Sequence, residues 1–181
     1  IANRKVQAYN ASIYGSYTFK NGLKPGLGVE YLSGTDMDAT NSHINSFNPW
    51  YGTNHKFNGL MDYFYVGNHI NSVGLVDVYA NLTYSTETFS VSVMPHMFSS
   101  AATITNSLNN EMDSYLGTEI DATITYKWTK SVSFQAGYSQ MFATESMAVL
   151  KGGNPHTTNN WAWAMITIKP SLFKTNLKFS E

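Results

Sequence analysis

The stretch LGTEIDATITYKW, residues 116–128 of this 181-residue chain, decides the expected fold because apolar and polar side chains alternate along it. One face carries leucine, isoleucine, alanine and aromatic residues, and the other carries Gly117, Glu119, Asp121, Thr123, Thr125 and Lys127. A period of two belongs to a β-strand, in which successive side chains point to opposite faces. The stretch therefore predicts a strand with one apolar and one polar face.

The same alternation recurs at residues 5–19, 75–84 and 132–142, and it is weaker at residues 26–32 and 89–98. Residues 161–168 are apolar on both faces, and we predict a strand there too. Several of the seven predicted strands are 10 or more residues long, against a usual length of about 5–6 in soluble sheets. We therefore expect an all-β, antiparallel protein that forms a single domain over residues 1–181.

The connections between these strands alternate in length. Residues 20–25, 85–88 and 129–131 are short turns, whereas residues 33–74, 99–114 and 144–160 are long loops. A transmembrane β-barrel of the bacterial outer membrane has this asymmetry, with short periplasmic turns and long external loops. We therefore expect an antiparallel transmembrane β-barrel surrounded by outer-membrane lipid. The alternative is a soluble sandwich, whose solvated face usually holds more lysine and glutamate than this polar face does.

The number of strands suggests a larger barrel. If the short turns are periplasmic, the first strand begins outside, whereas single-chain bacterial barrels have even strand numbers and both ends in the periplasm. We therefore expect the chain to supply about seven strands, as the C-terminal part of a larger barrel.

The composition excludes several classes of function. Eleven Lys and Arg balance 12 Asp and Glu, and the single arginine, Arg4, leaves no basic footprint for nucleic acid. There is no cysteine, and the five histidines lack the spacing of metal ligands. We therefore expect no metal and no cofactor. Ser, His and Asp residues occur without diagnostic spacing, so an outer-membrane hydrolase is only a runner-up and we expect no enzyme.

Charged and amide side chains on the predicted polar faces are candidates to line a lumen. They are Glu30, Asp77, Asn81, Glu119, Asp121 and Lys127. Rings of charged side chains set the selectivity of pores, so the carboxylates are expected to favour cations or to bind sugar hydroxyls. The alternative is that they only pair with lysines or water.

The longest loop, residues 33–74, contains the aromatic-rich segment FNPWYGTNHKFNGLMDYFYVGN at residues 47–68. A loop of this length is usually functional or disordered, and so many aromatic rings do not stay solvated. We expect it to be extracellular or to fold into the mouth of the pore. Candidates for a constriction or a sugar contact are Trp50, Tyr51, His55, Lys56 and Tyr65. The alternative is that the aromatic residues pack only to hold the loop in place.

This segment resembles the loop of alginate-export-type outer-membrane porins, and the ending NWAWAMITIKP, residues 160–170, resembles their terminal strand. The resemblance implies a channel that passes saccharides or small solutes by diffusion through the lumen. A path for a polyanion would be expected to carry Arg and Lys, whereas the predicted lumen here is mostly acidic. The alternative function is a barrel that acts as a scaffold or interaction partner in a larger outer-membrane complex.

Overall fold

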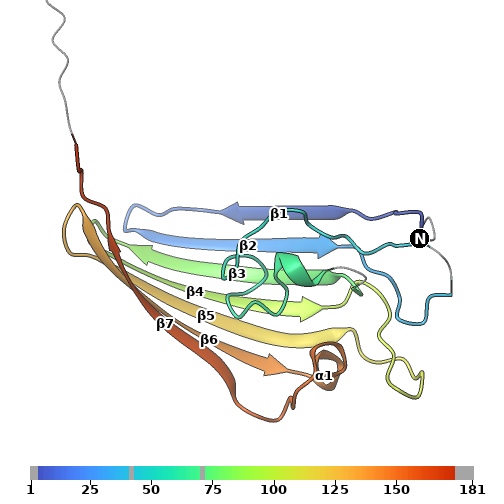
Figure 1. Ribbon diagram of the computed structural model, residues 1–181. Coiled ribbons are helices and arrows are strands. Elements are labelled where there is room, and N and C mark those ends of the chain that lie inside the picture. Colours follow the sequence, from blue (N-terminus) through green and yellow to red (C-terminus); the bar gives the residue numbers. More distant parts are fainter. Residues whose placement is uncertain (1–3, 41–42, 70–71, 174–181) are drawn as a thin grey trace, which may run out of the picture.

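The computed structural model describes residues 4–40, 43–69 and 72–173, in which seven strands form one antiparallel sheet (Figure 1). Each strand pairs with its neighbours in sequence. The strands are β1 (Asn10–Ser16), β2 (Leu23–Leu32), β3 (Leu75–Ser85), β4 (Phe89–Ser99), β5 (Tyr115–Lys127), β6 (Val132–Ala143) and β7 (Asn159–Ile168). The prediction of an all-β, antiparallel protein is confirmed. Within the described residues the sheet is open, because β1 and β7 each pair with one strand only.

The first strand is shorter than predicted. Residues 5–19 were expected to be extended throughout, but β1 covers only Asn10–Ser16. Before it, the chain pairs with the long loop instead, since Gln7 N donates to Ile44 O at 2.9 Å. After it, hydrogen bonds from Tyr17 N to Pro25 O at 3.1 Å and from Phe19 N to Leu23 O at 2.8 Å continue toward the turn before β2. The alternation of the sequence continues through both segments, so it does not mark where regular pairing stops.

The long and short connections lie at opposite ends of the sheet (Figure 1). Two short helices belong to the long connections: η1 (Val66–Asn68) precedes β3, and α1 (Glu145–Lys151) precedes β7. Thr144 is the N-cap of α1, and its Oγ1 accepts a hydrogen bond from Met147 N at 3.3 Å. Ser and Thr are favoured at this position because they satisfy a free backbone N–H.

The two faces of the sheet differ in polarity. Cross-strand register places apolar side chains of all seven strands on one face, which we call the outer face. Its exposed large side chains include Ile13, Leu27, Val78, Leu82, Val93, Met97, Ile120, Ile124, Phe142, Ile166 and Ile168. In the described part of the chain, no helix is both long and apolar enough to cross a bilayer.

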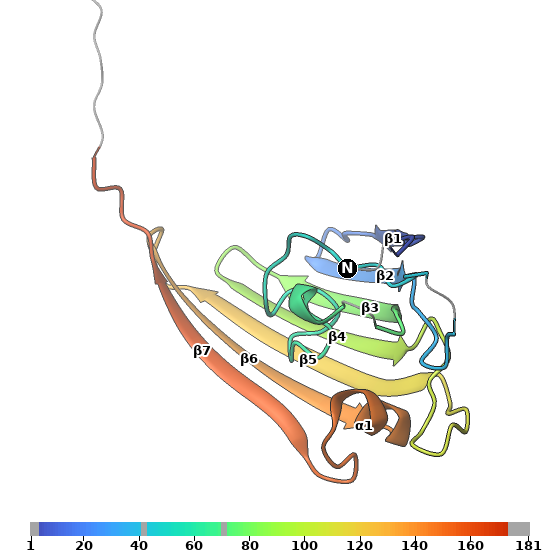
Figure 2. The same cartoon turned by 45° about the vertical axis from the view of Figure 1, so that its right-hand side comes forward.

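The opposite, inner face is covered at one end by the long loop. The loop lies over the sheet and is enclosed by its curvature (Figure 2). A small hydrophobic core forms there from strand ends, loops and α1: Leu32, Phe64, Val73, Leu75, Phe98, Ile104, Leu116, Met141 and Met147. The core is therefore not a layer between two sheets, as the sandwich alternative requires, but a local cluster at the end of the inner face where the long loops lie.

Candidate functional site

Four carboxylates and a histidine meet on the inner face. Glu30 of β2 lies opposite Asp77 of β3, and Glu119 of β5 lies opposite His96 of β4. Asp121 follows two residues later on the same face of β5. We call Glu30, Asp77, His96, Glu119 and Asp121 the acidic cluster. Asp77, Glu119 and Asp121 are 1%, 0% and 3% exposed, although ionisable groups are almost never fully buried unless they are paired.

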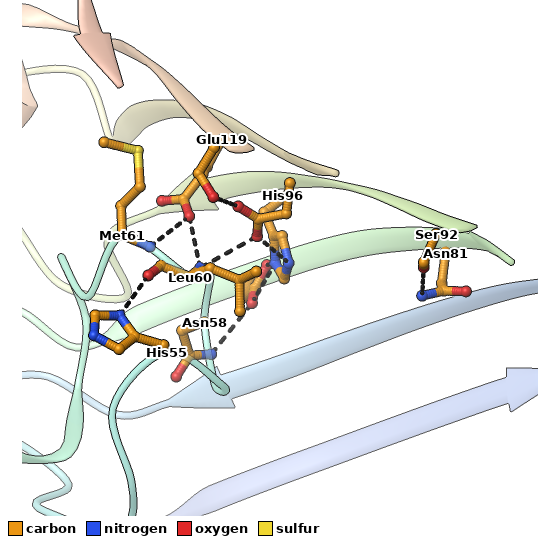
Figure 3. Close-up of polar contacts among 11 residues, drawn as sticks. His55, Asn58, Leu60, Met61, Asn81, Ser92, His96 and Glu119 are labelled. Carbon is orange, nitrogen blue, oxygen red and sulfur yellow. Dashed lines mark hydrogen bonds and ion pairs between the residues drawn. The ribbon is translucent and has the colours of Figure 1, made fainter. Parts of the chain in front are cut away.

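The tip of the long loop provides the hydrogen-bond donors for these carboxylates (Figure 3). Leu60 N donates to Glu119 Oε1 at 2.7 Å and to Asp121 Oδ2 at 3.2 Å, and Met61 N donates to Glu119 Oε1 at 2.9 Å. The Asn58 amide donates to Glu30 at 3.0 Å and to Asp77 at 3.2 Å. These hydrogen bonds hold the loop against the sheet.

The remaining carboxylate contacts come from the sheet itself. His96 Nδ1 lies 2.9 Å from Asp77 Oδ1, and His96 Nε2 lies 3.7 Å from Asp121 Oδ2. A protonated ring donates from both nitrogens and would bridge the two carboxylates. Ser139 of β6 donates to the other oxygen of Asp121. These contacts join four adjacent strands, β3 to β6, beneath the loop.

The loop tip has an unusual backbone. His55, Asn58, Gly59 and Asp62 all have positive φ, between 54° and 86°. An added Cβ at Gly59 would lie 2.6 Å from Glu119 Oε1, so the close approach of backbone to carboxylate requires glycine at this position. A left-handed backbone conformation costs conformational energy for any residue other than glycine, and residues strained in this way cluster at functional segments.

A second set of contacts joins the loop to β7, the strand at the other edge of the sheet from β1. The His55 imidazole stacks on the Trp161 indole of β7, with ring centroids 4.4 Å apart and planes inclined by 17°. His55 is held in this position by Leu60 O and Asp62. Next to this stack, the Asn159 amide of β7 contacts the Tyr63 hydroxyl. The loop therefore contacts β2, β3, β5 and β7 and spans the inner face.

The base of the loop is fixed to α1. The Lys151 ammonium lies over the Phe64 ring, 5.0 Å from its centroid, and His69 Nε2 contacts Phe64 O at 3.1 Å. Burial lowers the pKa of the His69 imidazole below its ordinary value, and the charge of Lys151 acts in the same direction. Burial also lowers the pKa of the Lys151 ammonium. The packing at this end therefore favours a neutral His69.

The inner face changes character away from the loop. Hydroxyl and amide groups bond to one another there: Asn81 Nδ2 donates to Ser92 Oγ at 3.2 Å, and Gln135 Nε2 donates to Thr125 Oγ1 at 3.3 Å. Figure 3 shows Asn81 and Ser92 well apart from the cluster. On the described strands, no Asp, Glu, Lys or Arg faces this side between the cluster and the turn end, where Lys24 and Lys127 lie. This part of the wall is polar but uncharged.

The structure brings together four of the six residues predicted to line a lumen. Glu30, Asp77, Glu119 and Asp121 meet, whereas Asn81 lies midway along β3 and Lys127 ends β5 at the short turns. The four carboxylates are covered by the loop. Their role as lining of an open pore stays a prediction.

The five predicted loop residues do not form one group. Trp50 and Tyr51 are 85% and 88% exposed, and His55 is at the tip. The Lys56 ammonium lies over the Phe57 ring, and Tyr65 caps η1. Phe64 and Tyr63 pack and hold the loop in place, whereas Trp50 and Tyr51 are exposed. A constriction or sugar contact by the five residues stays a prediction.

Sequence reasoning missed the groups that satisfy the carboxylates. Asn58, Gly59, His96 and Ser139 were not among the candidates, and neither were the backbone N–H groups of Leu60 and Met61. His96 and Ser139 do fall in phase with the polar faces of their strands, which is the signal that identifies them. The backbone donors had no such signal, because any residue carries one.

No family model matches this chain, and no curated protein matches it either. The fold and site therefore carry the functional argument.

Proposed function

We propose that this chain forms part of an outer-membrane β-barrel channel, in which small polar solutes diffuse through a lumen narrowed by the loop at residues 33–74. The observation that carries the proposal is the pairing of two features. The long loop folds onto the inner face, and the outer face is apolar and uncovered along all seven strands.

The uncovered apolar face supports a lipid environment. Monomeric soluble proteins rarely expose a continuous apolar patch larger than a few hundred Å². Here large apolar side chains are exposed on every strand, including Ile13 of β1 at 71% and Ile166 of β7 at 61%. In hydrocarbon every backbone donor and acceptor must be paired, so the free edges of β1 and β7 need further strands. A larger closed barrel meets that need.

The loop supports a constriction. It crosses the inner face from Glu30 of β2 to Trp161 of β7, and its tip is bonded to buried carboxylates rather than to solvent. A loop held in this way narrows the lumen of a barrel without closing it, provided that the remaining strands lie opposite. Diffusion past the loop then depends on solute size.

The charges support small neutral solutes over polyanions. The carboxylates beneath the loop accept hydrogen bonds from backbone donors or lie against His96, and the described wall between them and the lysines at the turn end is uncharged. The resemblance to alginate-export-type porins points to saccharides, but a uronic-acid polymer would meet no row of arginines here. We therefore propose neutral or weakly charged solutes, including saccharides.

The test is electrical. The native protein, extracted in detergent and added to planar bilayers, is expected to give discrete conductance steps, and its gel mobility should change on heating. A heat-modifiable barrel that stays electrically silent and copurifies with other outer-membrane proteins would overturn the channel and favour the scaffold alternative. Solubility without detergent would overturn the membrane assignment.

A further inference from the structure

A cavity of about 230 Å³ opens between the long loop and the β1–β2 edge of the sheet, beside the acidic cluster. Its wall combines aromatic rings with a few converging polar groups, which is the composition of ligand sites in general. The aromatic part includes Tyr51 and Phe57 of the loop, and the polar part includes Asn10, Glu30 and Asn58. From this arrangement, we propose that the cavity binds one ring of a neutral saccharide.

The polar groups are already oriented. The Glu30 carboxylate accepts from Asn10 Nδ2 at 2.9 Å through Oε1 and from Asn58 Nδ2 at 3.0 Å through Oε2. A carboxylate offers about four acceptor directions, so each oxygen retains capacity for a ligand donor. Because two amides hold the carboxylate in place, its two oxygens are oriented to accept from two adjacent sugar hydroxyls, whose spacing is similar to that of the oxygens. Preorganisation of this kind reduces the cost of binding.

The aromatic rings are the second requirement. A pyranose presents a face of C–H groups that packs on an aromatic ring, and that ring must be accessible in the free protein. Tyr51 is 88% exposed and Phe57 is 51% exposed, although both belong to the cavity wall. These exposed rings lie next to converging polar groups, so a bound ligand would cover them.

The charge of the cavity selects among sugars. Its wall contains Glu30 but no Lys or Arg among the described residues. The nearby Lys56 ammonium is placed over the Phe57 ring, 5.2 Å from its centroid. The one histidine among the described residues of the wall, His69, is buried and its pKa is lowered, so it supplies no dependable positive charge. The carboxylate of a uronic acid would approach Glu30 without a compensating cation, and the cavity therefore disfavours it.

Size sets how much of a saccharide is held. Pockets that enclose whole small molecules usually exceed about 300 Å³. A cavity of about 230 Å³ therefore suits one monosaccharide unit and leaves the rest of an oligosaccharide in the lumen. The inference deepens the proposed channel function and rests on it, because a saccharide must enter the mouth to reach this wall.

The experiment measures equilibrium binding in detergent micelles, which does not depend on conduction. Maltotriose is the neutral probe and trigalacturonate is the anionic probe of similar size, and saturation-transfer NMR titrations report both. We expect saturable binding of maltotriose and at least about tenfold weaker binding of trigalacturonate, the ratio that 1.4 kcal/mol represents. Equal binding of the two probes, or no saturable binding of maltotriose, would overturn the cavity assignment while conductance without sugar still tests the channel.

Variants locate the site. Tyr51→Ala should weaken maltotriose binding about tenfold, whereas Leu108→Ala, which removes an exposed apolar side chain of another long loop outside the cavity wall, should leave it unchanged. Glu30→Gln should narrow the discrimination against trigalacturonate. An equal loss in Leu108→Ala and Tyr51→Ala would overturn the site. Heat-modifiable mobility identifies folded variants, and Phe57→Leu, which removes the ring but keeps the bulk, provides a second test if Tyr51→Ala does not fold.

Discussion

Leu60 N, at the tip of the long loop, donates a 2.7 Å hydrogen bond to Glu119 Oε1 in the middle of the inner face, 59 residues further along the chain. Met61 N donates to the same oxygen, so one buried carboxylate oxygen anchors two consecutive backbone amides. This relationship holds the loop against the inner face of the sheet. It also makes Glu119 the most direct place to test the loop's role.

Removing the anchor should widen the channel. Glu119→Ala removes the acceptor of Met61 N, at a cost of about 1–3 kcal/mol, and leaves Leu60 N with only its longer hydrogen bond to Asp121. We expect the loop to leave the inner face, single-channel conductance to rise, and proteolysis of residues 50–62 to accelerate. Glu119→Gln retains a carbonyl acceptor and should stay near wild type. Glu87→Ala, at an exposed turn at the other end of the sheet, is the control. Unchanged conductance in Glu119→Ala would contradict the constriction.

Gly59 offers a matched pair of substitutions. Gly59 and Gly153 have nearly equal φ, +86° and +89°, but an added Cβ meets Glu119 only at Gly59 and open space at Gly153. A left-handed conformation costs a residue with a Cβ about 1–2 kcal/mol, so Ala should pay this at both positions. Only Gly59→Ala should also displace the loop tip and raise conductance. If both variants behave alike, close approach to Glu119 does not explain the glycine.

The apolar outer face can be tested with lysine. Val78→Lys and Ala122→Lys should each cost about 2–4 kcal/mol near the bilayer midplane and impair assembly. Thr123 is next to Ala122 but lies on the inner face, so Thr123→Lys should be tolerated. The measurement is the free energy of unfolding in lipid vesicles. Normal stability of both outer-face variants would rule out lipid contact at this face.

The packing of His69 predicts a pH dependence. Burial lowers its pKa in the folded loop, so the unfolded loop binds the proton more tightly. The contribution of neutral His69 is therefore complete above its unfolded pKa of about 6.5 and is lost as the pH falls below that value. In the wild-type protein, the rate of proteolysis of the loop should increase as the pH is lowered from 7.5 to 5.5. His69→Gln, which keeps a donor for Phe64 O, should flatten this profile; an identical profile in both proteins would contradict it.

The strands and their two faces followed from the alternation of side chains alone. In residues 116–128, a one-residue slip would exchange the apolar set for the polar set, so the pattern defines which residues share a face. Glu119 and Asp121 could therefore be placed on the polar side, and the lengths of the connections placed the long loops at one end. These inferences need only local geometry, because the alternation of side chains along a strand is determined by the residues of that strand.

The composition of the site depended on how the strands and loop pack together. The pairing of Glu119 with His96 depends on register between strands, and that of Asn58 with Glu30 depends on the path of the loop. The register of the strands and the path of the loop both depend on packing between segments that are distant in sequence. The donors that satisfy Glu119 are backbone N–H groups, which leave no mark in a sequence. Alternation could thus identify which side chains share the inner face, but only the three-dimensional packing could show that a loop covers them.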